Sequence, residues 1–192
     1  MLKMENVSFG YIKDKLVIND LSISIPYKNI GIRGENGIGK TTILNLIDQK
    51  YKYDGKILVD GCVYFPKDLF DKYARLKLEE IIDLIKCLDS FECESLNQYI
   101  TALRIEKYLS YEIGNLSKGT RKKISILMAL LSKSSTILLD EPFESIDRES
   151  NLNFSKIVHK KSNNFIIVSH DIEYLNLATD KIYELRDGKL YE

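Results

Sequence analysis

The hydrophobic pattern of the chain changes its period several times, and each change predicts a different element. Between Leu16 and Ile25 apolar and polar residues alternate, which predicts an antiparallel strand, and the apolar run 30–32 predicts a second strand. Apolar residues then recur at helical spacing after Lys40, between residues about 70 and 115, and from Lys118 to Leu131.

The last third of the chain alternates between strand-like and helix-like patterns. We expect strands at 135–139 and 165–169, and helices at 149–159 and 173–179. Strands that alternate with helices predict a mainly parallel sheet with helices on its faces.

Length and composition indicate one ordinary folded domain. The chain has 192 residues, of which 44% are hydrophobic and 29% charged. Its 28 basic residues balance 28 acidic ones, so nucleic acid is not an expected partner. No apolar run approaches the roughly 20 residues of a membrane span, and the N-terminus lacks an apolar signal segment. Three cysteines without CxxC spacing favour a reduced, cytoplasmic protein.

A glycine-rich segment stands between a predicted strand and a predicted helix. The pattern GxxxxGK[ST] is met by Gly34, Glu35, Asn36, Gly37, Ile38, Gly39, Lys40 and Thr41. Glycines let backbone amides turn towards phosphate oxygens, and the helix N-terminus adds positive partial charge. We expect Lys40 to reach the outer phosphates, the Thr41 hydroxyl to ligate Mg²⁺, and Thr42 to belong to the same nucleotide site. The alternative is a glycine turn that merely precedes a helix.

Two carboxylates follow the apolar run 136–139. Their position, at the end of a predicted strand and far downstream of a phosphate loop, is typical of phosphate-loop ATPases. Asp140 is expected to hold Mg²⁺, and Glu141 to face the water that attacks the γ-phosphate. The alternative is a buried strand that exits into a solvated acidic turn.

The pentapeptide Leu116-Ser117-Lys118-Gly119-Thr120 resembles LSGGQ, the signature of the ATP-binding cassette (ABC) family. Lys118 replaces the first glycine and Thr120 the final glutamine, but the segment lies a short helix before the Asp-Glu strand, as in that family. The resemblance assigns Ser117 and Gly119 to nucleotide binding, as a second anion site at a helix N-terminus. The alternative is an ordinary serine N-cap.

Further motifs of the family follow in order along nearly the whole chain. Tyr11 matches the aromatic residue that stacks on adenine, although Phe9 is a rival for that role. Residues 145–147 resemble the loop that crosses between the two nucleotide sites of a dimer, and His170 matches the switch histidine that contacts the γ-phosphate. Lys67 stands where the family has a glutamine that binds Mg²⁺, and an ammonium group cannot do so. We therefore expect an altered coupling loop. Lys67 would point either towards the γ-phosphate oxygens, as a substitute cation, or away into solvent or the partner interface, and we favour the second.

The resemblance implies an α/β fold: a RecA-like P-loop core, an N-terminal antiparallel β-subdomain and a helical subdomain at about 70–115, all within one domain over residues 1–192. It also implies an Mg-ATP hydrolase in which Lys40, Glu141 and His170 are catalytic. The expected partners are a second ATP-binding subunit, in a head-to-tail homodimer, and a separate transmembrane permease. The chain itself is expected to be cytoplasmic and peripheral, on the cytoplasmic face of the membrane. The compact chain is similar to the subunits of small peptide, bacteriocin-resistance or haem exporters.

Two other classes of protein compete with a transport ATPase. A cassette protein that acts on ribosomes or DNA would carry a second cassette with a basic linker, or long coiled coils, and the sequence contains neither. A nucleotide-gated regulatory subunit without hydrolysis is the other rival. The presence of Glu141 and His170 argues against it.

Overall fold

A three-stranded antiparallel sheet is built from the N-terminal part of the chain. The structure is a computed structural model that describes residues 2–12, 15–65, 69–70 and 73–192. The sheet has the order β2-β1-β4, formed by β1 (Leu2–Phe9), β2 (Ile18–Ile25) and β4 (Asp54–Leu58). Along β2 the apolar side chains of Ile18, Leu21 and Ile25 are buried while the polar ones between them are exposed. The register with β1 shifts between Leu21 and Ile18, and this irregularity interrupts the alternation and lets both side chains face the core.

A six-stranded sheet forms the centre of the molecule. Its order is β5-β6-β7-β3-β8-β9, and all neighbours are parallel except the β8–β9 hairpin. The strands are β3 (Asn29–Arg33), β5 (Cys62–Phe65), β6 (Thr136–Asp140), β7 (Asn164–Val168), β8 (Lys181–Arg186) and β9 (Lys189–Tyr191). The predicted mainly parallel sheet is confirmed.

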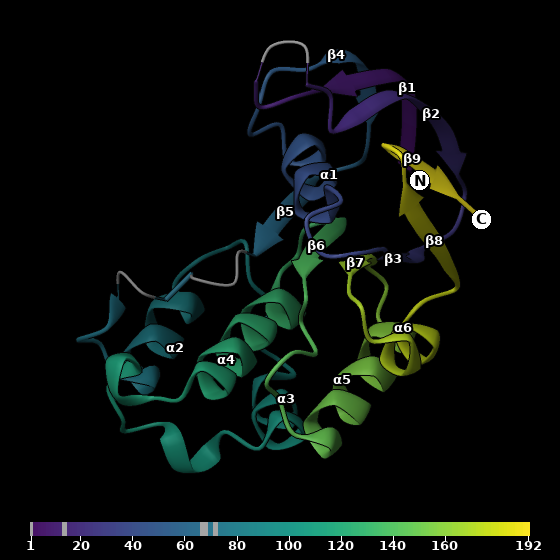
Figure 1. The fold of residues 1–192 in the computed structure, drawn as a ribbon. Helices are drawn as coiled ribbons and strands as arrows, with labels where there is room; N and C mark the ends of the chain where they lie inside the picture. The colour runs from purple at the N-terminus through teal and green to yellow at the C-terminus, as the bar shows by residue number, and fades with distance from the viewer. Residues whose placement is uncertain (1, 13–14, 66–68, 71–72) are drawn as a thin grey trace.

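Helices cover both faces of this sheet and extend from one end of it. They are α1 (Lys40–Ile47), α2 (Leu78–Lys86), α3 (Leu96–Leu103), α4 (Lys118–Leu131), α5 (Arg148–Lys160) and α6 (Ile172–Ala178), with short 3₁₀ turns at Glu106–Tyr108 and Ile113–Asn115. Figure 1 shows α1 between the two sheets, and α2, α3 and α4 grouped away from the antiparallel sheet. The α/β fold with an antiparallel sheet and a helical part is as predicted.

Two hydrophobic cores lie on opposite faces of the central sheet, and successive residues of β6 alternate between them. Ile137 and Leu139 pack into the core under α4 and α5, whereas Leu138 packs into the core that contains α1 and the antiparallel sheet. A strand buried on both faces reads as a continuous apolar run, which explains why the sequence at 136–139 lacks polar alternation.

Among the strands that were not expected from the sequence are β4, β8 and β9. The hairpin between β8 and β9 turns at Asp187 and Gly188, which have φ angles of 51° and 73°. An Asp-Gly pair in this conformation is typical of a two-residue hairpin turn, so a local signal was present. It was overlooked because charged residues interrupt the flanking strands.

Among the residues that the structure describes, no helix has the length and apolar character to cross a membrane.

Candidate functional site

The phosphate loop joins β3 to α1 and carries glycines with positive φ angles. Gly37 has a φ angle of 81° and Gly39 one of 113°. A Cβ atom at Gly39 would lie 2.7 Å from Cγ1 of Val17, so this position excludes a side chain for reasons of space as well as backbone conformation. α1 begins at Lys40, the first residue after the loop, which is where the sequence pattern predicted it.

Lys40 is folded back onto its own loop. Its Nζ donates hydrogen bonds to the carbonyl oxygens of Gly34 at 2.8 Å and Glu35 at 3.0 Å, and the residue is buried. These carbonyl oxygens are weak, neutral partners for an ammonium group. Anionic phosphate oxygens make stronger, charge-assisted bonds, so a nucleotide can displace them.

Tyr11 lies beside the first turn of α1. Its hydroxyl is 3.0 Å from Oγ1 of Thr42, and its ring makes an edge-to-face contact with Phe9, with the centroids 5.0 Å apart. Phe9 in turn stacks on Tyr51, with the centroids 5.3 Å apart, and packs against the core. Tyr11 is 56% exposed, so of the two rival aromatic residues it is the one with ring surface left for an adenine.

Thr41 and Asp140 meet although they are 99 positions apart in the chain. Oγ1 of Thr41 donates a hydrogen bond of 2.8 Å to Oδ2 of Asp140, which is buried at the carboxyl end of β6. In the part of the chain that the structure describes, no cluster of three or more His, Cys, Asp or Glu could hold a metal ion by itself. A pair of oxygen ligands fits Mg²⁺, which usually takes one or two protein oxygens and completes its shell with phosphate oxygens and water.

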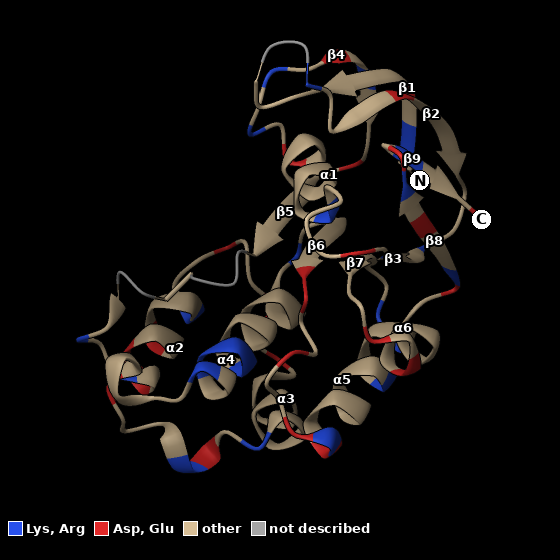
Figure 2. Cartoon of the chain, in the orientation of Figure 1, with Lys and Arg blue, Asp and Glu red and all other residues tan. Residues whose placement is uncertain are grey.

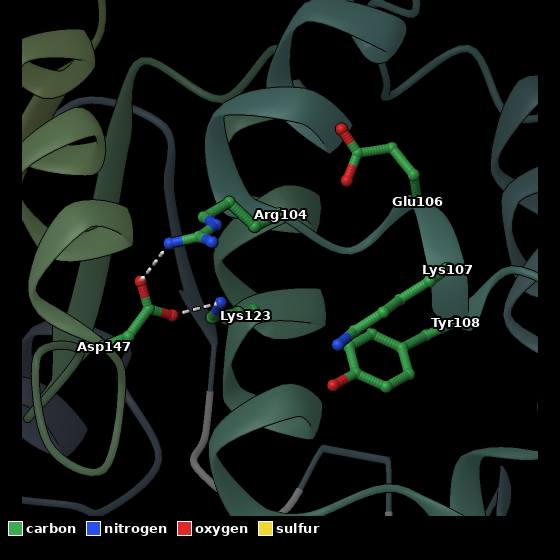
Figure 3. Close-up of a pocket in the computed structure, with 6 residues that line it drawn as sticks. All are labelled: Arg104, Glu106, Lys107, Tyr108, Lys123 and Asp147. Atoms are coloured by element: carbon green, nitrogen blue, oxygen red, sulfur yellow. Dashed lines mark ion pairs between the residues drawn. The ribbon is translucent and has the colours of Figure 1, made fainter.

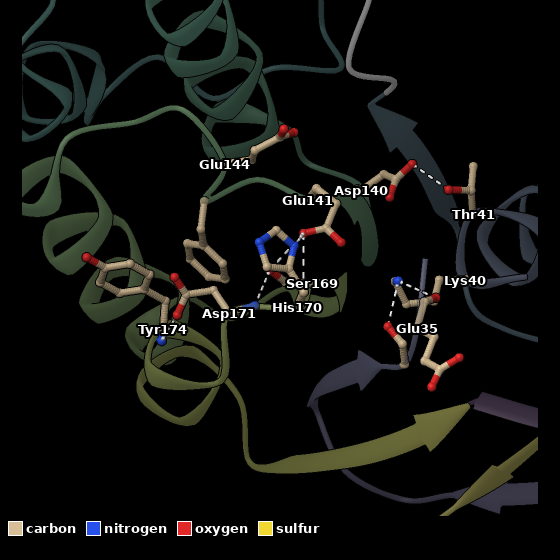
Figure 4. Close-up of polar contacts among 12 residues, drawn as sticks. Glu35, Lys40, Thr41, Asp140, Glu141, Glu144, Ser169, His170, Asp171 and Tyr174 are labelled. Atoms are coloured by element: carbon tan, nitrogen blue, oxygen red, sulfur yellow. Dashed lines mark hydrogen bonds and ion pairs between the residues drawn. The ribbon is translucent and has the colours of Figure 1, made fainter. Parts of the chain in front are cut away.

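The carboxylate of Glu141 is held by groups at the end of β7 (Figure 4). Its Oε2 accepts hydrogen bonds from Oγ of Ser169 at 3.0 Å and from the backbone N–H of His170 at 3.2 Å, and lies 2.9 Å from Nδ1 of His170. The His170 side chain is 62% exposed, whereas Glu141 is buried. An anchored carboxylate beside a solvent-accessible imidazole suits a base and a sensor of bound phosphate.

The phosphate loop and the two carboxylates of β6 line one cleft. Its lining residues are Asn36, Gly37, Gly39, Lys40, Thr41, Thr42, Asp140 and Glu141. The structure thus brings together most of the residues predicted for ATP and Mg²⁺. Gly34, Glu35 and Ile38 belong to the loop itself and hold its shape. The Ile38 N–H donates to the Glu35 carbonyl oxygen at 3.4 Å.

Ser117 and Gly119 lie at the start of α4 and do not line that cleft. Oγ of Ser117 caps the helix by accepting a hydrogen bond of 3.1 Å from the N–H of Thr120. A Cβ atom at Gly119 would lie 2.1 Å from the carbonyl oxygen of Ser145, so only glycine permits this approach between the signature segment and the loop at 145–147. The signature segment and this loop therefore touch within one chain.

Asp147 ends this loop and caps α5. Its carboxylate accepts from the Ser150 N–H at 3.0 Å and pairs with Nζ of Lys123 at 2.5 Å and Nη1 of Arg104 at 3.8 Å (Figure 3). Burial raises the pKa of Asp147, but the hydrogen bonds from Lys123 and Ser150 outweigh this effect and lower the pKa to about 2.

Sequence reasoning missed Lys122, which is buried beneath the segment that follows β6. Its Nζ donates a hydrogen bond of 2.7 Å to the carbonyl oxygen of Glu141. Lys122 stands in the basic run 121–123 near the start of an expected helix, so its neighbours in the sequence gave no sign that it is buried. Lys67 lies outside the described residues, so the expectation for the coupling loop stays a prediction. His159 is exposed on α5, as expected for a solvated helix residue.

Fold and site together define a phosphate-loop ATPase. A family model described as "ABC transporter" matches residues 18–144, and the chain belongs to this family. It is an ATP-binding subunit of the ABC transporter type and an ATP hydrolase. The curated relatives include the nickel import system ATP-binding protein NikE of Staphylococcus aureus (strain USA300), which is 27% identical over 208 residues, covering 100% of this chain and 89% of the relative.

Solved structures of cassettes share the fold across the full chain. A putative cobalt transport ATP-binding protein aligns with a TM-score of 0.81 at 23% identity, covering 100% of this chain and 79% of that one. The dimeric bacterial ABC transporter cassette MJ0796 aligns with a TM-score of 0.81 at 20% identity, covering 100% of this chain and 97% of that one. The expectation of a small-peptide or bacteriocin-type exporter is not confirmed, because the curated relative named above is a nickel import protein.

Proposed function

We propose that this chain binds and hydrolyses Mg-ATP in the cleft between the phosphate loop and β6, within a head-to-tail dimer that drives a separate membrane permease. One observation carries the proposal: the loop lysine, the Thr41–Asp140 pair and the anchored Glu141 carboxylate converge on a single cleft. The transported substrate would be recognised by the permease. The likeness to a nickel import protein therefore supports a transport role without assigning nickel to this chain.

Binding of ATP would exchange partners at the phosphate loop. Lys40 would leave the carbonyl oxygens of Gly34 and Glu35 for the outer phosphates, while the loop amides and the N-terminus of α1 face the remaining oxygens. Tyr11 would stack on the adenine. Thr41 and Asp140 would hold Mg²⁺, which when bound neutralises charge on the phosphate oxygens.

Hydrolysis would use Glu141 as the base that orients or deprotonates the attacking water. Ser169 and the His170 backbone already fix one carboxylate oxygen of Glu141, which leaves the other oxygen available to water. The exposed His170 imidazole would turn from Glu141 towards the γ-phosphate. Fixing these groups before reaction lowers the cost of reorganising them in the transition state.

A complete site would need two copies of the chain. Ser117 and Gly119 lie at the N-terminus of α4, and neither residue lines the cleft that contains Lys40. In a head-to-tail dimer each α4 N-terminus would face the γ-phosphate bound by the partner's loop. We place the dimer at the cytoplasmic face of the membrane, docked on the permease. We further propose that Lys67 affects stimulation by the permease rather than basal turnover.

The test is the substitution Glu141→Gln, which keeps the shape of the side chain but removes the base. We expect ATP affinity to be preserved and phosphate release to slow by about 100-fold or more. With hydrolysis blocked, size-exclusion chromatography should show a dimer in Mg-ATP and a monomer without it. The exposed Glu94→Gln is the matched control.

Unchanged turnover in the Glu141→Gln variant would show that Glu141 is not the base for hydrolysis. A monomer under both conditions would count against the head-to-tail dimer. Absence of hydrolysis in the unsubstituted protein, with ATP still bound, would favour the regulatory-subunit alternative.

A further inference from the structure

A buried lysine joins both ends of the turn that carries Glu141. The Lys122 side chain is 5% exposed, and its Nζ donates to the Glu141 carbonyl oxygen at 2.7 Å and to Oε2 of Glu144 at 3.3 Å. The Glu144 N–H closes the same turn by donating to the Glu141 carbonyl oxygen at 3.3 Å. Figure 2 shows basic residues on the first turns of α4 and acidic residues along the segment that follows β6.

The backbone of Glu141 is in a conformation that needs support. Its φ angle is 49°, in the left-handed region that non-glycine residues rarely adopt. Its N–H donates to the Val168 carbonyl oxygen at 2.8 Å, and its carbonyl oxygen accepts from Lys122. The residue is therefore held by β7 on one side and by α4 on the other.

A structural role alone does not require a charged group at position 122. Burying an ammonium group is unfavourable unless polar partners compensate for the lost water, and an apolar side chain would fill the same space without that cost. Lys122 instead directs its charge to the carbonyl oxygen of the residue whose carboxylate faces the cleft. Glu144, with its side chain 40% exposed, supplies the counter-charge from the far end of the turn.

We propose that Lys122 is a positioning residue for ATP hydrolysis: it holds the turn from Glu141 to Glu144 so that the Glu141 carboxylate is directed into the cleft. This inference rests on the proposed role of Glu141 as the base. Lys122 is not among the residues that line the cleft, so it acts on the rate of hydrolysis through Glu141 rather than on ATP affinity.

The experiment compares Lys122→Met, Lys122→Gln and Lys122→Arg in the full chain, with the exposed Lys156→Met as control. Met retains the apolar stem without a donor, Gln is one atom shorter and uncharged, and Arg keeps a charged donor. We expect kcat to fall by about 10-fold or more for Met and Gln, and Arg to restore most of it, while the Kd for a fluorescent ATP analogue stays within about twofold throughout. If Lys122→Met does not fold, the Gln–Arg pair decides alone.

Glu141→Gln, measured in parallel, separates the two proposals. In the double variant Lys122→Gln/Glu141→Gln we expect no loss of kcat beyond that of Glu141→Gln alone. Lys122 acts only through the base at position 141, and Glu141→Gln has already removed that base. A folded Met or Gln variant with unchanged kcat, a loss that Arg does not restore, or additive losses in the double variant would overturn the inference. Retained turnover in Glu141→Gln would instead overturn the role of Glu141 itself.

Discussion

The N-termini of α1 and α4 are the two helix ends assigned to phosphate, and they are built differently. α1 follows Gly39, which has no side chain to offer its first-turn amides. α4 follows Ser117, whose hydroxyl already accepts from the Thr120 N–H. Lys40, the first residue of α1, is buried and bound to loop carbonyl oxygens, whereas Lys118, the first residue of α4, is largely exposed.

This difference indicates that the two ends contribute unequally to nucleotide binding. The α1 end combines open glycine backbone, a helix dipole and a lysine poised within its own loop, so it can bind phosphate in a single chain. The α4 end is already capped and has no share in that cleft. In the proposed head-to-tail dimer it would add only what a second copy can use, and it would then determine dimer formation rather than ATP affinity.

The largest expected effect is that of Lys40→Ala, which changes the N-terminus of α1. Removing the loop ammonium leaves the outer phosphate charge without its side-chain cation, and we expect ATP affinity to fall by about 100-fold or more. Equilibrium binding of a fluorescent ATP analogue measures this, with the exposed Lys133→Ala as control. Unchanged affinity and turnover would refute the phosphate-loop assignment and with it the comparison of the two ends.

A smaller and different effect is expected when the α4 end is changed. Ser117→Arg places bulk and a misdirected charge at the second anion site, so in the Glu141→Gln background we expect the ATP-dependent dimer to weaken by at least about 10-fold. Binding of ATP to the monomer should stay unchanged. Sedimentation velocity with and without Mg-ATP measures the dimer. Ser117→Ala removes the helix cap without adding bulk, so it distinguishes the effect of losing the cap from steric block of the dimer. Weaker binding to the monomer would show that the α4 end belongs to the site of its own chain.

The smallest expected effect concerns the loop that contacts Gly119. Asp147→Asn keeps a good helix cap but removes the ion pair with Lys123, and because Asp147 is partly exposed we expect a loss of about 1 kcal/mol in the free energy of unfolding at neutral pH. The folded pKa of about 2 lies below the unfolded value, so the pair stabilises the fold above about pH 4. The difference between the two proteins should shrink as pH falls from about 4 to about 2. A difference that is independent of pH would show that the charge of Asp147 is not what stabilises the loop.

Local patterns predicted the elements that carry the motifs. α1 and α4 begin at Lys40 and Lys118, where the sequence placed them, because a glycine turn and a serine cap define those ends locally. β4 was missed because a short, charged strand owes its pairing to a partner elsewhere in the chain, here β1. β8 and β9 were missed because charged residues interrupt the strands on both sides of their Asp-Gly turn. The contact between Gly119 and Ser145 could not be foreseen either, since it joins two turns with no shared pattern.

Short motifs were enough to predict the phosphate loop, the two carboxylates at the end of β6 and their proposed assignment to ATP, because the residue types of each motif are set by the ligand. How those groups are held could be seen only in the folded chain. The left-handed backbone of Glu141, its anchoring by Ser169 and His170, and the buried Lys122 beneath it depend on β6, β7 and α4 packing together. The physical reason is that a buried charge is stable only where distant segments supply its partners, and spacing along the chain does not reveal which segments those are.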